Sequence, residues 1–510
     1  MNATVQELPK RVHVIGICGV ATSALAIAFH DIGIAVSGSD KGFFPPISIE
    51  LEKHKIDFYA GWHMEKMVRK GVPNIVIVGT ASGSQNPETA YAKENGIPIY
   101  SFAEAVGKYF AKENSIVCAG TWGKTSSSAL LSFILDRAGY DPTYMFGGIS
   151  LSHDSSAKLT GRSWSVFEGD EYKSSPTDHR AKFFHYKPTH LLLTAISWDH
   201  ADLYPAEKDY FNAFEKLIGM IPDNSFIVGC SDNTKTIKAM DTFRGEKIFY
   251  GKKVTSINSD LKTLDSRFRG NDTVDSFTES NESTNPKNIK LDYDYDNITQ
   301  SSKGLEFTIS HSGELFTVRS PMLGSFQAEN ITGCFAMAHK LGIEPKKIVE
   351  AISQFKGLKR RLEKRVDGDI TQKGVTIIDD IAHSPEKASS VLATLQEIYQ
   401  GKVICIFEPN SGGRSRESIG KYDDAFKDAD IVVIPRLTKL KAATDDSEKP
   451  IEGEELANII KKTHANVHFI ENDEEVVGFL KANSEKGDVI AFLGSHGFRG
   501  MIEEAINIVS

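Results

Sequence analysis

A single run of nine residues constrains this chain more than any other feature, because it carries the parts of a phosphate-binding loop in the required order. Residues 118–126 read Cys-Ala-Gly-Thr-Trp-Gly-Lys-Thr-Ser, between an apolar strand expected at 115–117 and a helix expected to continue through Leu135. Backbone N–H groups of such a turn point at phosphates, and the helix N-terminus favours negative charge. Lys124 can reach the outer phosphates and the Thr125 hydroxyl can hold Mg²⁺. The run predicts an ATP or GTP site; the alternative is a plain strand-to-helix turn.

Composition and charge exclude several classes of protein. The 510 residues suffice for about three domains. A net charge of −9 is mild for this length and predicts neither nucleic acid nor an anionic membrane as partner. No apolar run is long enough to span a membrane, and the polar residues 1–10 lead straight into an expected strand. We therefore expect a cytoplasmic protein.

The first segment, residues 1–110, begins with a strand–helix–strand pattern. A strand expected at 11–15 runs into a turn that contains Gly16 and Gly19, and a second strand ends at Asp40. An acidic residue at this separation can meet a ribose, but the glycines that a dinucleotide fingerprint needs at positions 18 and 21 are absent. The pattern leaves two interpretations open, nucleotide binding and plain strand-to-helix packing.

Two further segments complete the chain. Residues 111–357 contain the phosphate loop and a polar stretch at about 256–288 that resembles a surface insertion. Residues 358–510 alternate strand and helix patterns. The strands there are expected at 375–379, 403–407, 431–435, 467–470 and 489–493. The predicted fold class is α/β with three domains, the phosphate loop lying in the central one.

Acidic residues follow two expected strands of the central segment. Glu168 ends one strand, and Asp199 and His200 follow the next. Carboxylates at strand ends beside a phosphate loop suit Mg²⁺, which prefers oxygen ligands, and His200 could ligate a second ion or contact a transferring phosphoryl group. Each cluster alone is compatible with a solvated turn or a cap.

These motifs together resemble the Mur ligases, ATP-dependent enzymes that join amino acids or peptides to UDP-N-acetylmuramate. Six segments in the family's order carry the resemblance, which covers nearly the whole chain outside the polar stretch. They are Gly120-Thr121-Trp122-Gly123-Lys124-Thr125, Glu168-Gly169-Asp170-Glu171, Asp199-His200, residues 324–330, Lys359-Arg360-Arg361 and residues 379–385.

The resemblance implies a Rossmann-like UDP-binding domain, a central P-loop ATPase domain and a C-terminal Rossmann-like domain. It also implies a role for each matching residue. Catalysis would rest on Lys124, Glu168, His200 and Arg361. ATP would contact Gly120, Thr121, Trp122, Gly123, Lys124, Thr125, Ser126, Gln327, Asn330, Arg361 and Asp380. Mg²⁺ would be held by Thr125, Glu168 and His200, and the sugar nucleotide and the second substrate by Gly16, Gly19, Asp40 and His383.

Within the family, local strings resemble the murein peptide ligase branch. These are residues 16–19, 44–48, 171–188 and 407–411. That branch returns the tripeptide L-alanyl-γ-D-glutamyl-meso-diaminopimelate to UDP-N-acetylmuramate in peptidoglycan recycling, with an acyl phosphate as intermediate. One alternative is a UDP-N-acetylmuramate–L-alanine ligase of peptidoglycan biosynthesis. Another, suggested by Trp122, Gln327 and Ser384 at positions where the family has other residues, is a nucleotide-binding homologue without turnover. We expect a monomer or a weak homodimer.

Overall fold

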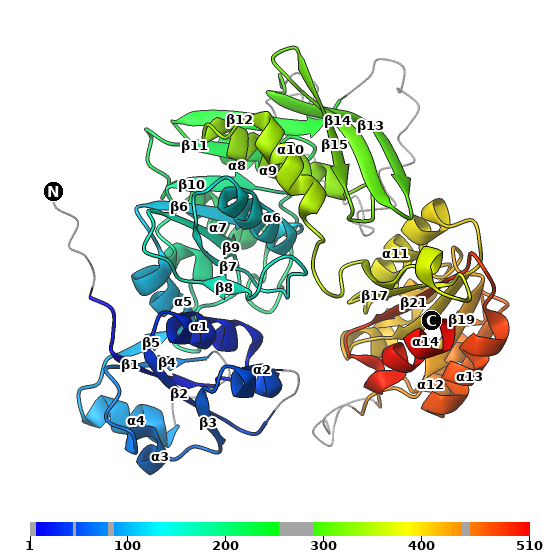
Figure 1. Cartoon of the computed structure of the whole chain (residues 1–510), viewed down its shortest axis with the longest axis horizontal. Helices are drawn as coiled ribbons and strands as arrows, with labels where there is room; N and C mark the ends of the chain where they lie inside the picture. The colour runs from blue at the N-terminus through cyan, green and yellow to red at the C-terminus, as the bar shows by residue number, and fades with distance from the viewer. Residues whose placement is uncertain (1–6, 44–46, 80–85, 254–288, 440–448) are drawn as a thin grey trace.

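The computed structural model describes residues 7–43, 47–79, 86–253, 289–439 and 449–510, and contains three sheets in chain order (Figure 1). The predicted polar insertion and residues 44–46 of the Phe-Pro-Pro string lie outside the described residues. Within the described ranges, no helix has the length and apolarity that a membrane crossing requires. The chain is an α/β protein with mainly parallel sheets.

The first sheet has five parallel strands in the order β3-β2-β1-β4-β5. The strands are β1 (Arg11–Ile15), β2 (Ala35–Asp40), β3 (Asp57–Ala60), β4 (Ile75–Val78) and β5 (Ile99–Ser101). The helices are α1 (Val20–Asp31), α2 (Ile47–Lys53), α3 (Met64–Val68), α4 (Pro87–Glu94) and α5 (Phe102–Ala105), which continues into a π-helical turn at Val106–Phe110. The strand order reverses between β1 and β4, so the turn at Gly16 opens at the switch point where such sheets bind ligands.

The central sheet has ten strands in the order β15-β14-β13-β12-β11-β10-β6-β9-β7-β8. Its strands are β6 (Asn114–Ala119), β7 (Thr143–Met145), β8 (Ala157–Lys158), β9 (Trp164–Gly169), β10 (His190–Leu193), β11 (Phe226–Cys230), β12 (Glu246–Lys252), β13 (Tyr293–Ser301), β14 (Gly304–His311) and β15 (Glu314–Ser320). Its helices are α6 (Lys124–Arg137), α7 (Glu207–Ile218), α8 (Thr234–Met240), α9 (Gln327–Lys340) and α10 (Pro345–Gln354). The antiparallel hairpins β13–β15 extend one edge. The parallel strands β6, β9 and β10 lie side by side, which brings the groups after their carboxyl ends together.

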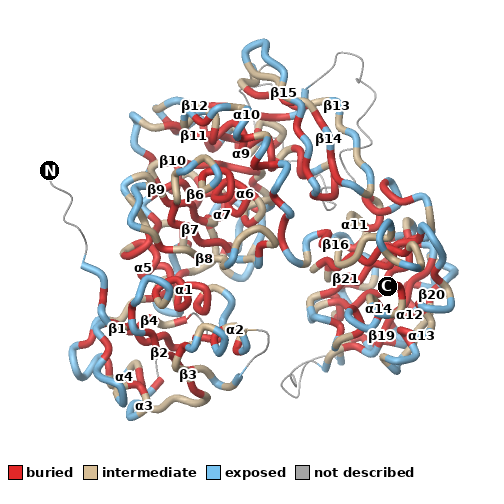
Figure 2. Tube along the Cα trace, in the orientation of Figure 1, coloured by how far each residue is buried: buried red, intermediate tan, exposed pale blue. Residues whose placement is uncertain are grey.

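The third sheet has six strands in the order β16-β17-β21-β18-β19-β20, and only β16 is antiparallel to its neighbour. The strands are β16 (Glu363–Val366), β17 (Thr376–Asp380), β18 (Val403–Glu408), β19 (Ile431–Pro435), β20 (Val467–Ile470) and β21 (Val489–Gly494). The helices are α11 (Pro385–Ile398), α12 (Gly453–Ile460), α13 (Asp473–Asn483) and α14 (Met501–Val509). Buried residues follow the strands, as Figure 2 shows, and the five strands predicted from apolar runs are all present, each with its ends within one residue.

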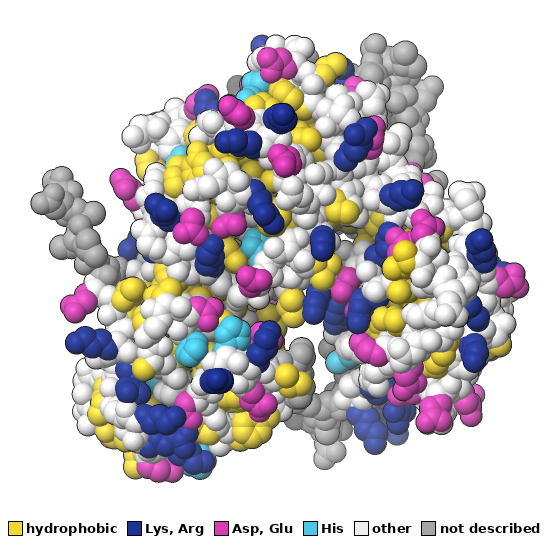
Figure 3. Space-filling model, viewed as in Figure 1, with side chains coloured by type: hydrophobic (Ala, Val, Ile, Leu, Met, Phe, Trp, Pro, Cys, Tyr) yellow, Lys and Arg dark blue, Asp and Glu magenta, His cyan; other side chains and the backbone are white. Residues whose placement is uncertain are grey.

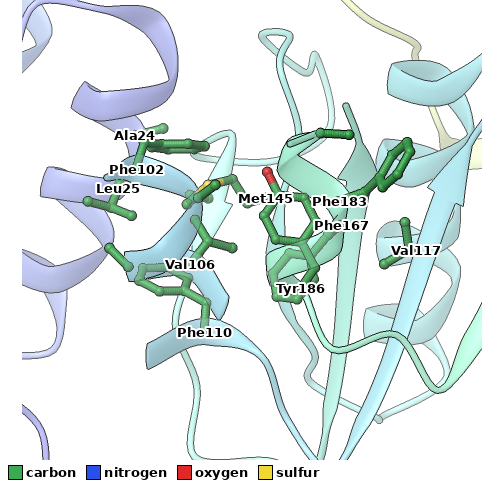
Figure 4. Close-up of a cluster of buried hydrophobic side chains, with 14 of the residues drawn as sticks. Ala24, Leu25, Phe102, Val106, Phe110, Val117, Met145, Phe167, Phe183 and Tyr186 are labelled. Carbon is green, nitrogen blue, oxygen red and sulfur yellow. The ribbon is translucent and has the colours of Figure 1, made fainter. Parts of the chain in front are cut away.

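The first and central sheets share one hydrophobic cluster. Side chains from α1, α5 and the π-helical turn point toward side chains around β7, β9 and residues 182–186 (Figure 4). The two groups are Ala24, Leu25, Phe102, Val106 and Phe110 on one side, and Met145, Phe167, Phe183 and Tyr186 on the other. Burial of these large apolar side chains joins the two parts firmly.

The third sheet is joined to the central one through the connecting segment. Leu358 pairs with Ser150 in an isolated antiparallel bridge. The N–H of Lys359 donates to the carbonyl of Ile149 at 2.8 Å, and the N–H of Leu151 donates to the carbonyl of Gly357 at 3.0 Å. Lys364 also donates to the carbonyl of Ser302. This connection is mainly backbone pairing, to which Leu323 adds an apolar contact with the third-domain cluster, and it is less extensive than the shared apolar core of the first two sheets.

Candidate active site

The phosphate loop leaves β6 and enters α6, and two of its glycines cannot be replaced. Gly120 has φ 134° and Gly123 has φ 79°, both in the left-handed half of conformational space. A Cβ at Gly120 would lie 2.0 Å from Thr194 Oγ1, and one at Gly123 would lie 2.2 Å from Asn330 Oδ1. Loop shape and close packing therefore both require glycine.

The segment after β10 and the helix α7 hold the loop by hydrogen bonds. The Thr121 hydroxyl donates to the carbonyl of Ser197 at 2.6 Å, and its oxygen lies 2.9 Å from the Tyr210 hydroxyl. The Thr194 hydroxyl, which follows β10, donates to the carbonyl of Trp122 at 2.6 Å. The indole of Trp122 itself is 48% exposed. The loop is thus fixed while its outer face stays open.

Glu171 is the centre of the charged cluster beside the loop, and its side chain is 1% exposed. Lys124 Nζ donates to Glu171 Oε1 at 3.0 Å, and the Tyr210 hydroxyl donates to the same oxygen at 3.3 Å. His200 Nε2 lies 3.6 Å from it. Glu171 Oε2 is buried and has no hydrogen-bond partner among the described residues. A buried, unpartnered carboxylate oxygen is costly unless a cation reaches it.

Thr125 and Glu168 form the second polar pair of the loop. The Thr125 hydroxyl donates to Glu168 Oε1 at 2.6 Å. Glu168 Oε2 accepts the N–H of Gly147. Ser126 follows in the first turn of α6, half-buried. The hydroxyl of Thr125 and the carboxylates of Glu168 and Glu171 offer the hard oxygen ligands that Mg²⁺ prefers, so this donor set fits the ion.

His200 reaches the cluster from a strained backbone, with φ 56°. The neighbouring Asp199 accepts the His200 N–H at 2.7 Å. The close Glu171 carboxylate raises the pKa of His200 above 6.5; the charge of Asp199 adds to the rise, and burial opposes it. The imidazole therefore keeps its proton to a higher pH than a free histidine side chain does.

Gln327 and Asn330 lie at the start of α9 against the loop. Both are buried, and Asn330 Nδ2 donates to Gln327 Oε1 at 3.3 Å. The adjacent Phe326 is 43% exposed, which leaves an aromatic face open to solvent beside these amides. The amides and the exposed ring are groups that can contact a purine base.

The third-sheet residues are not brought against the loop in the same way. Arg361 is exposed, whereas Arg360 is tied down by Asp379 Oδ1 at 3.3 Å and by three carbonyls, those of Gly494, Ser495 and His496. Arg361 lies three residues after Leu358, the residue that pairs with Ser150. It therefore stays near the central sheet with a side chain free to reach a ligand.

The side chains of Asp380 and His383 both form hydrogen bonds with nearby backbone groups. Asp380 Oδ2 accepts the N–H of Leu362 at 2.6 Å and Oδ1 accepts the N–H of Ala382 at 2.7 Å, while burial raises the pKa of the carboxyl. His383 Nδ1 donates to the carbonyl of Ile381 at 2.6 Å, and burial lowers its pKa. In this arrangement the carboxylate of Asp380 shapes the loop; its contact with ribose stays a prediction.

A cavity of about 660 Å³ lies between the first and central sheets. One wall carries Gly16, Gly19 and Asp40, and the other carries Glu168 and Asp170. Asp40 braces the first wall, because its Oδ2 accepts the N–H of Cys18 at 2.8 Å and its Oδ1 accepts the N–H of Lys41 at 2.7 Å. The cavity thus joins the switch point of the first sheet to the carboxylate beside Thr125.

Sequence reasoning gave no role to two residues that the structure places in the site. Glu171 was visible as the last acid of the Glu168–Glu171 motif, and the signal was its position beside the loop. Tyr210 had no such signal, because a tyrosine on an amphipathic helix reads as a core residue. Only the packing of α7 against the loop brings its hydroxyl to Glu171.

Comparison with known proteins finds similar chains among curated ligases and solved structures. The curated UDP-N-acetylmuramate–L-alanine ligase of Caldanaerobacter subterraneus subsp. tengcongensis is 28% identical over 492 residues, 95% of each chain. The protein of that name from Caldicellulosiruptor bescii is 28% identical over 97% of each chain. Among solved structures, a UDP-N-acetylmuramate–alanine ligase of Thermotoga maritima matches with TM-score 0.73 and a murein peptide ligase of Psychrobacter arcticus with TM-score 0.63, each at 20% identity over 98% of both chains.

Three family models match in succession along the chain. Residues 11–114 match the Mur ligase family catalytic domain, 118–338 the Mur ligase middle domain, and 360–496 the Mur ligase glutamate ligase domain. Together, the three matches cover most of all three sheets and the whole phosphate loop. The chain therefore belongs to the Mur ligase family of ATP-dependent, ADP-forming amide ligases.

Proposed function

We propose that this Mur ligase uses ATP and Mg²⁺ to join L-alanine to the lactyl carboxylate of UDP-N-acetylmuramate. The observation that carries the proposal is the cavity that runs from Gly16 and Asp40 to Glu168. A sugar nucleotide held at the switch point of the first sheet would extend its sugar toward the phosphate loop. Its carboxylate would then lie beside the groups that hold the nucleotide.

The reaction needs an activated carboxylate, because a carboxylate ion is a poor acylating agent. A lactyl oxygen attacks the γ-phosphorus of ATP, the bond to ADP breaks, and an acyl phosphate forms. The amine of the second substrate attacks the acyl carbon, the bond to phosphate breaks, and the nitrogen loses a proton. The protein's part is to position the groups and neutralise charge.

Different residues at the loop would bind the phosphates and the metal ion. Lys124 and the N–H groups of residues 120–126 would hold the phosphates, so Lys124 would exchange part of its ion pair with Glu171 for the nucleotide. Thr125 and Glu168 would hold Mg²⁺, with His200 and the open oxygen of Glu171 at a second position. The ion supplies charge neutralisation at the transferring phosphoryl group.

The remaining predicted contacts come from two other elements. Gln327 and Asn330 would hold adenine, with Phe326 and Trp122 as open aromatic faces next to them. Arg361 would contact phosphate and Asp380 the ribose after the third domain moves toward the loop. His383 would face the second substrate.

The choice of L-alanine as donor rests on the relatives that carry that name, and the alanine ligase structure also matches with a higher TM-score than the murein peptide ligase, 0.73 against 0.63. The tripeptide donor is the second candidate. It is favoured by the Gly16-Ile17-Cys18-Gly19 turn and by a match with murein peptide ligase over 98% of both chains.

One assay separates the candidates. ADP release is measured with UDP-N-acetylmuramate, Mg²⁺ and ATP, and with L-alanine, L-alanyl-D-glutamate or the tripeptide as donor. We expect the highest kcat/KM with L-alanine. A higher value with the tripeptide would overturn the donor assignment and leave the ligase chemistry intact, whereas absence of ADP release with every donor would reject both and favour a homologue without turnover.

A further inference from the structure

We propose that the first domain carries a transition-metal site formed by His30, Asp31 and His54, separate from the catalytic Mg²⁺ site. His30 and Asp31 are the last two residues of α1, and His54 directly follows α2. One ligand atom from each of the three residues lies within 4.8 Å of the other two. Histidine side chains gather over α1 and α2 on the face seen in Figure 3.

The distances match the edges of a tetrahedral site. His54 Nδ1 lies 3.4 Å and His30 Nδ1 lies 3.7 Å from the same oxygen, Asp31 Oδ1. Metal–ligand bonds of about 2.0–2.1 Å in a tetrahedron place neighbouring ligands about 3.3 Å apart. The third edge, between the two nitrogens, closes by side-chain rotation, because all three residues are partly exposed.

A hydrogen bond orients the imidazole of His54, and the Nδ1 atom of His30 is left without a hydrogen-bond partner in the described ranges. His54 Nε2 donates to Glu50 Oε1 at 3.2 Å, which leaves the lone pair of Nδ1 directed at Asp31. His30 Nδ1 is buried and makes no hydrogen bond within the described part of the chain. A carboxylate that fixes the tautomer of a ligating histidine is the usual outer partner of a metal-bound imidazole. Without a cation, the lone pair of His54 Nδ1 would face the Asp31 carboxylate oxygen, and two hydrogen-bond acceptors repel each other.

The surroundings favour a cation at this point. The site lies at the C-terminal end of α1, where the helix dipole presents partial negative charge. The Lys53 ammonium group is paired with Glu50, to whose Oε1 it donates at 3.3 Å. Two imidazoles and one carboxylate select divalent first-row metals such as Zn²⁺ over Mg²⁺, which prefers a shell made mainly of oxygen ligands.

The ion would link α1 and α2, two helices that begin at or after residues of the cavity wall. The first turn of α1 contains Val20, Ala21 and Thr22, which line the cavity, and α2 follows Asp40 and Lys41, which also line it. A metal at the far end of α1 would therefore stabilise the first domain without touching the reacting groups. The inference does not depend on the donor substrate.

The test uses Zn²⁺ and Co²⁺ with the full chain in excess Mg²⁺. We expect one equivalent of Zn²⁺ by calorimetry, visible absorption bands of tetrahedral Co²⁺, and a higher midpoint of thermal unfolding with Zn²⁺. His54→Ala and His30→Ala should abolish all three signals, and Glu50→Gln should weaken Zn²⁺ affinity by about 10- to 100-fold. The matched control is His179→Ala, at an exposed histidine outside the cluster, which should bind as the parent does.

Two results would overturn the proposal. One is the absence of saturable Zn²⁺ binding to the parent chain. The other is equal Zn²⁺ affinity in His54→Ala, His30→Ala and His179→Ala, which would place the ion elsewhere. Thermal unfolding without metal shows that each variant is folded, so loss of binding reports on the ligands themselves.

Discussion

At the scale of single residues, Lys124 is the most sensitive position of the site. Its ammonium group is held at Glu171 in a largely buried place, ready to meet the outer phosphates. We expect Lys124→Ala to lower kcat for ADP release by about 1,000-fold or more, the magnitude of a lost cationic contact in phosphoryl transfer. The control Lys235→Ala removes a surface ion pair with Glu207 and should keep the parent rate. Parent-like turnover in Lys124→Ala would remove this lysine from the mechanism.

The pairing of His200 with Glu171 makes a second prediction, about pH. The pKa of His200 is raised above 6.5, and only the neutral imidazole can act as a metal ligand. The rate should therefore fall as pH decreases through this raised pKa. Glu171→Gln removes the main cause of the rise, so the acid limb of the kcat/KM profile should move to lower pH while the maximal rate falls. An unshifted limb would show that another group titrates there.

At the scale of elements, the turn between β6 and α6 is closely packed against its neighbours. Gly123→Ala would place a methyl group 2.2 Å from Asn330 Oδ1 at a backbone with φ 79°. We expect a loss of about 1 kcal/mol or more in the free energy of unfolding and strongly weakened ATP binding. Gly478→Ala, in the exposed face of α13 with open space around it, should instead stabilise by about 0.5–1 kcal/mol. Denaturant titration of both variants checks the contrast.

The segment after β7 contains a histidine that links stability to acid. His153 packs among Tyr144, Phe146 and Phe133, and burial lowers its pKa to about 4. The unfolded chain takes up this proton near pH 6.5 and the folded chain only near pH 4, so stability should fall as pH decreases across that window. The slope is at most about 1.4 kcal/mol per pH unit for one group.

The comparison variant for this effect is His153→Gln, which cannot take up a proton. Its free energy of unfolding, measured by urea titration between pH 6.5 and 5.5, should depend less steeply on pH than that of the parent. Equal slopes would assign the acid sensitivity to other groups.

Element by element, the sequence predicted parallel strands better than antiparallel ones. Four of the five predicted third-sheet strands are fully buried, mainly apolar runs, such as Ile431–Pro435, and burial on both faces gives them this pattern. The hairpin strands β13–β15 alternate buried and exposed residues and follow a polar stretch, so no apolar run marked them. β16, Glu-Lys-Arg-Val, has a charged sequence and becomes a strand only by pairing with β17.

At the scale of the whole molecule, the two junctions between domains differ in kind. The first and central domains share an apolar core, whereas the third is attached mainly through backbone pairing at residues 356–359. The predicted nucleotide contacts are divided between central and third domains. We expect small-angle scattering to give a smaller radius of gyration with an ATP analogue and UDP-N-acetylmuramate than without ligands. An unchanged radius at saturation would contradict this movement.

The candidate site was predictable where it lies on consecutive residues and hidden where it depends on tertiary contacts. The loop, Glu168 and His200 were predicted from motifs at strand ends. The burial of both Asp380 oxygens against Leu362 and Ala382, and the convergence of Lys124, His200 and Tyr210 on Glu171, depend on which elements pack together. The identity of the donor substrate is harder to predict, because the sequence resembles two branches of the family that share the same chemistry.

The pairing of Leu358 with Ser150 has a geometric consequence for catalysis. A Cβ added at Gly148 would lie 3.0 Å from Thr125 Cγ2 and 3.4 Å from Leu358 Cδ1, so the hinge adjoins the phosphate loop itself. Arg361 is three residues from that pivot, at most about 11 Å along an extended chain. A rotation that swings the far edge of the third domain, around β20, through a wide arc would displace this arginine only slightly. Fluorescent labels on the outer edge would thus register large opening and closing, while the arginine needs only a short movement to reach the nucleotide.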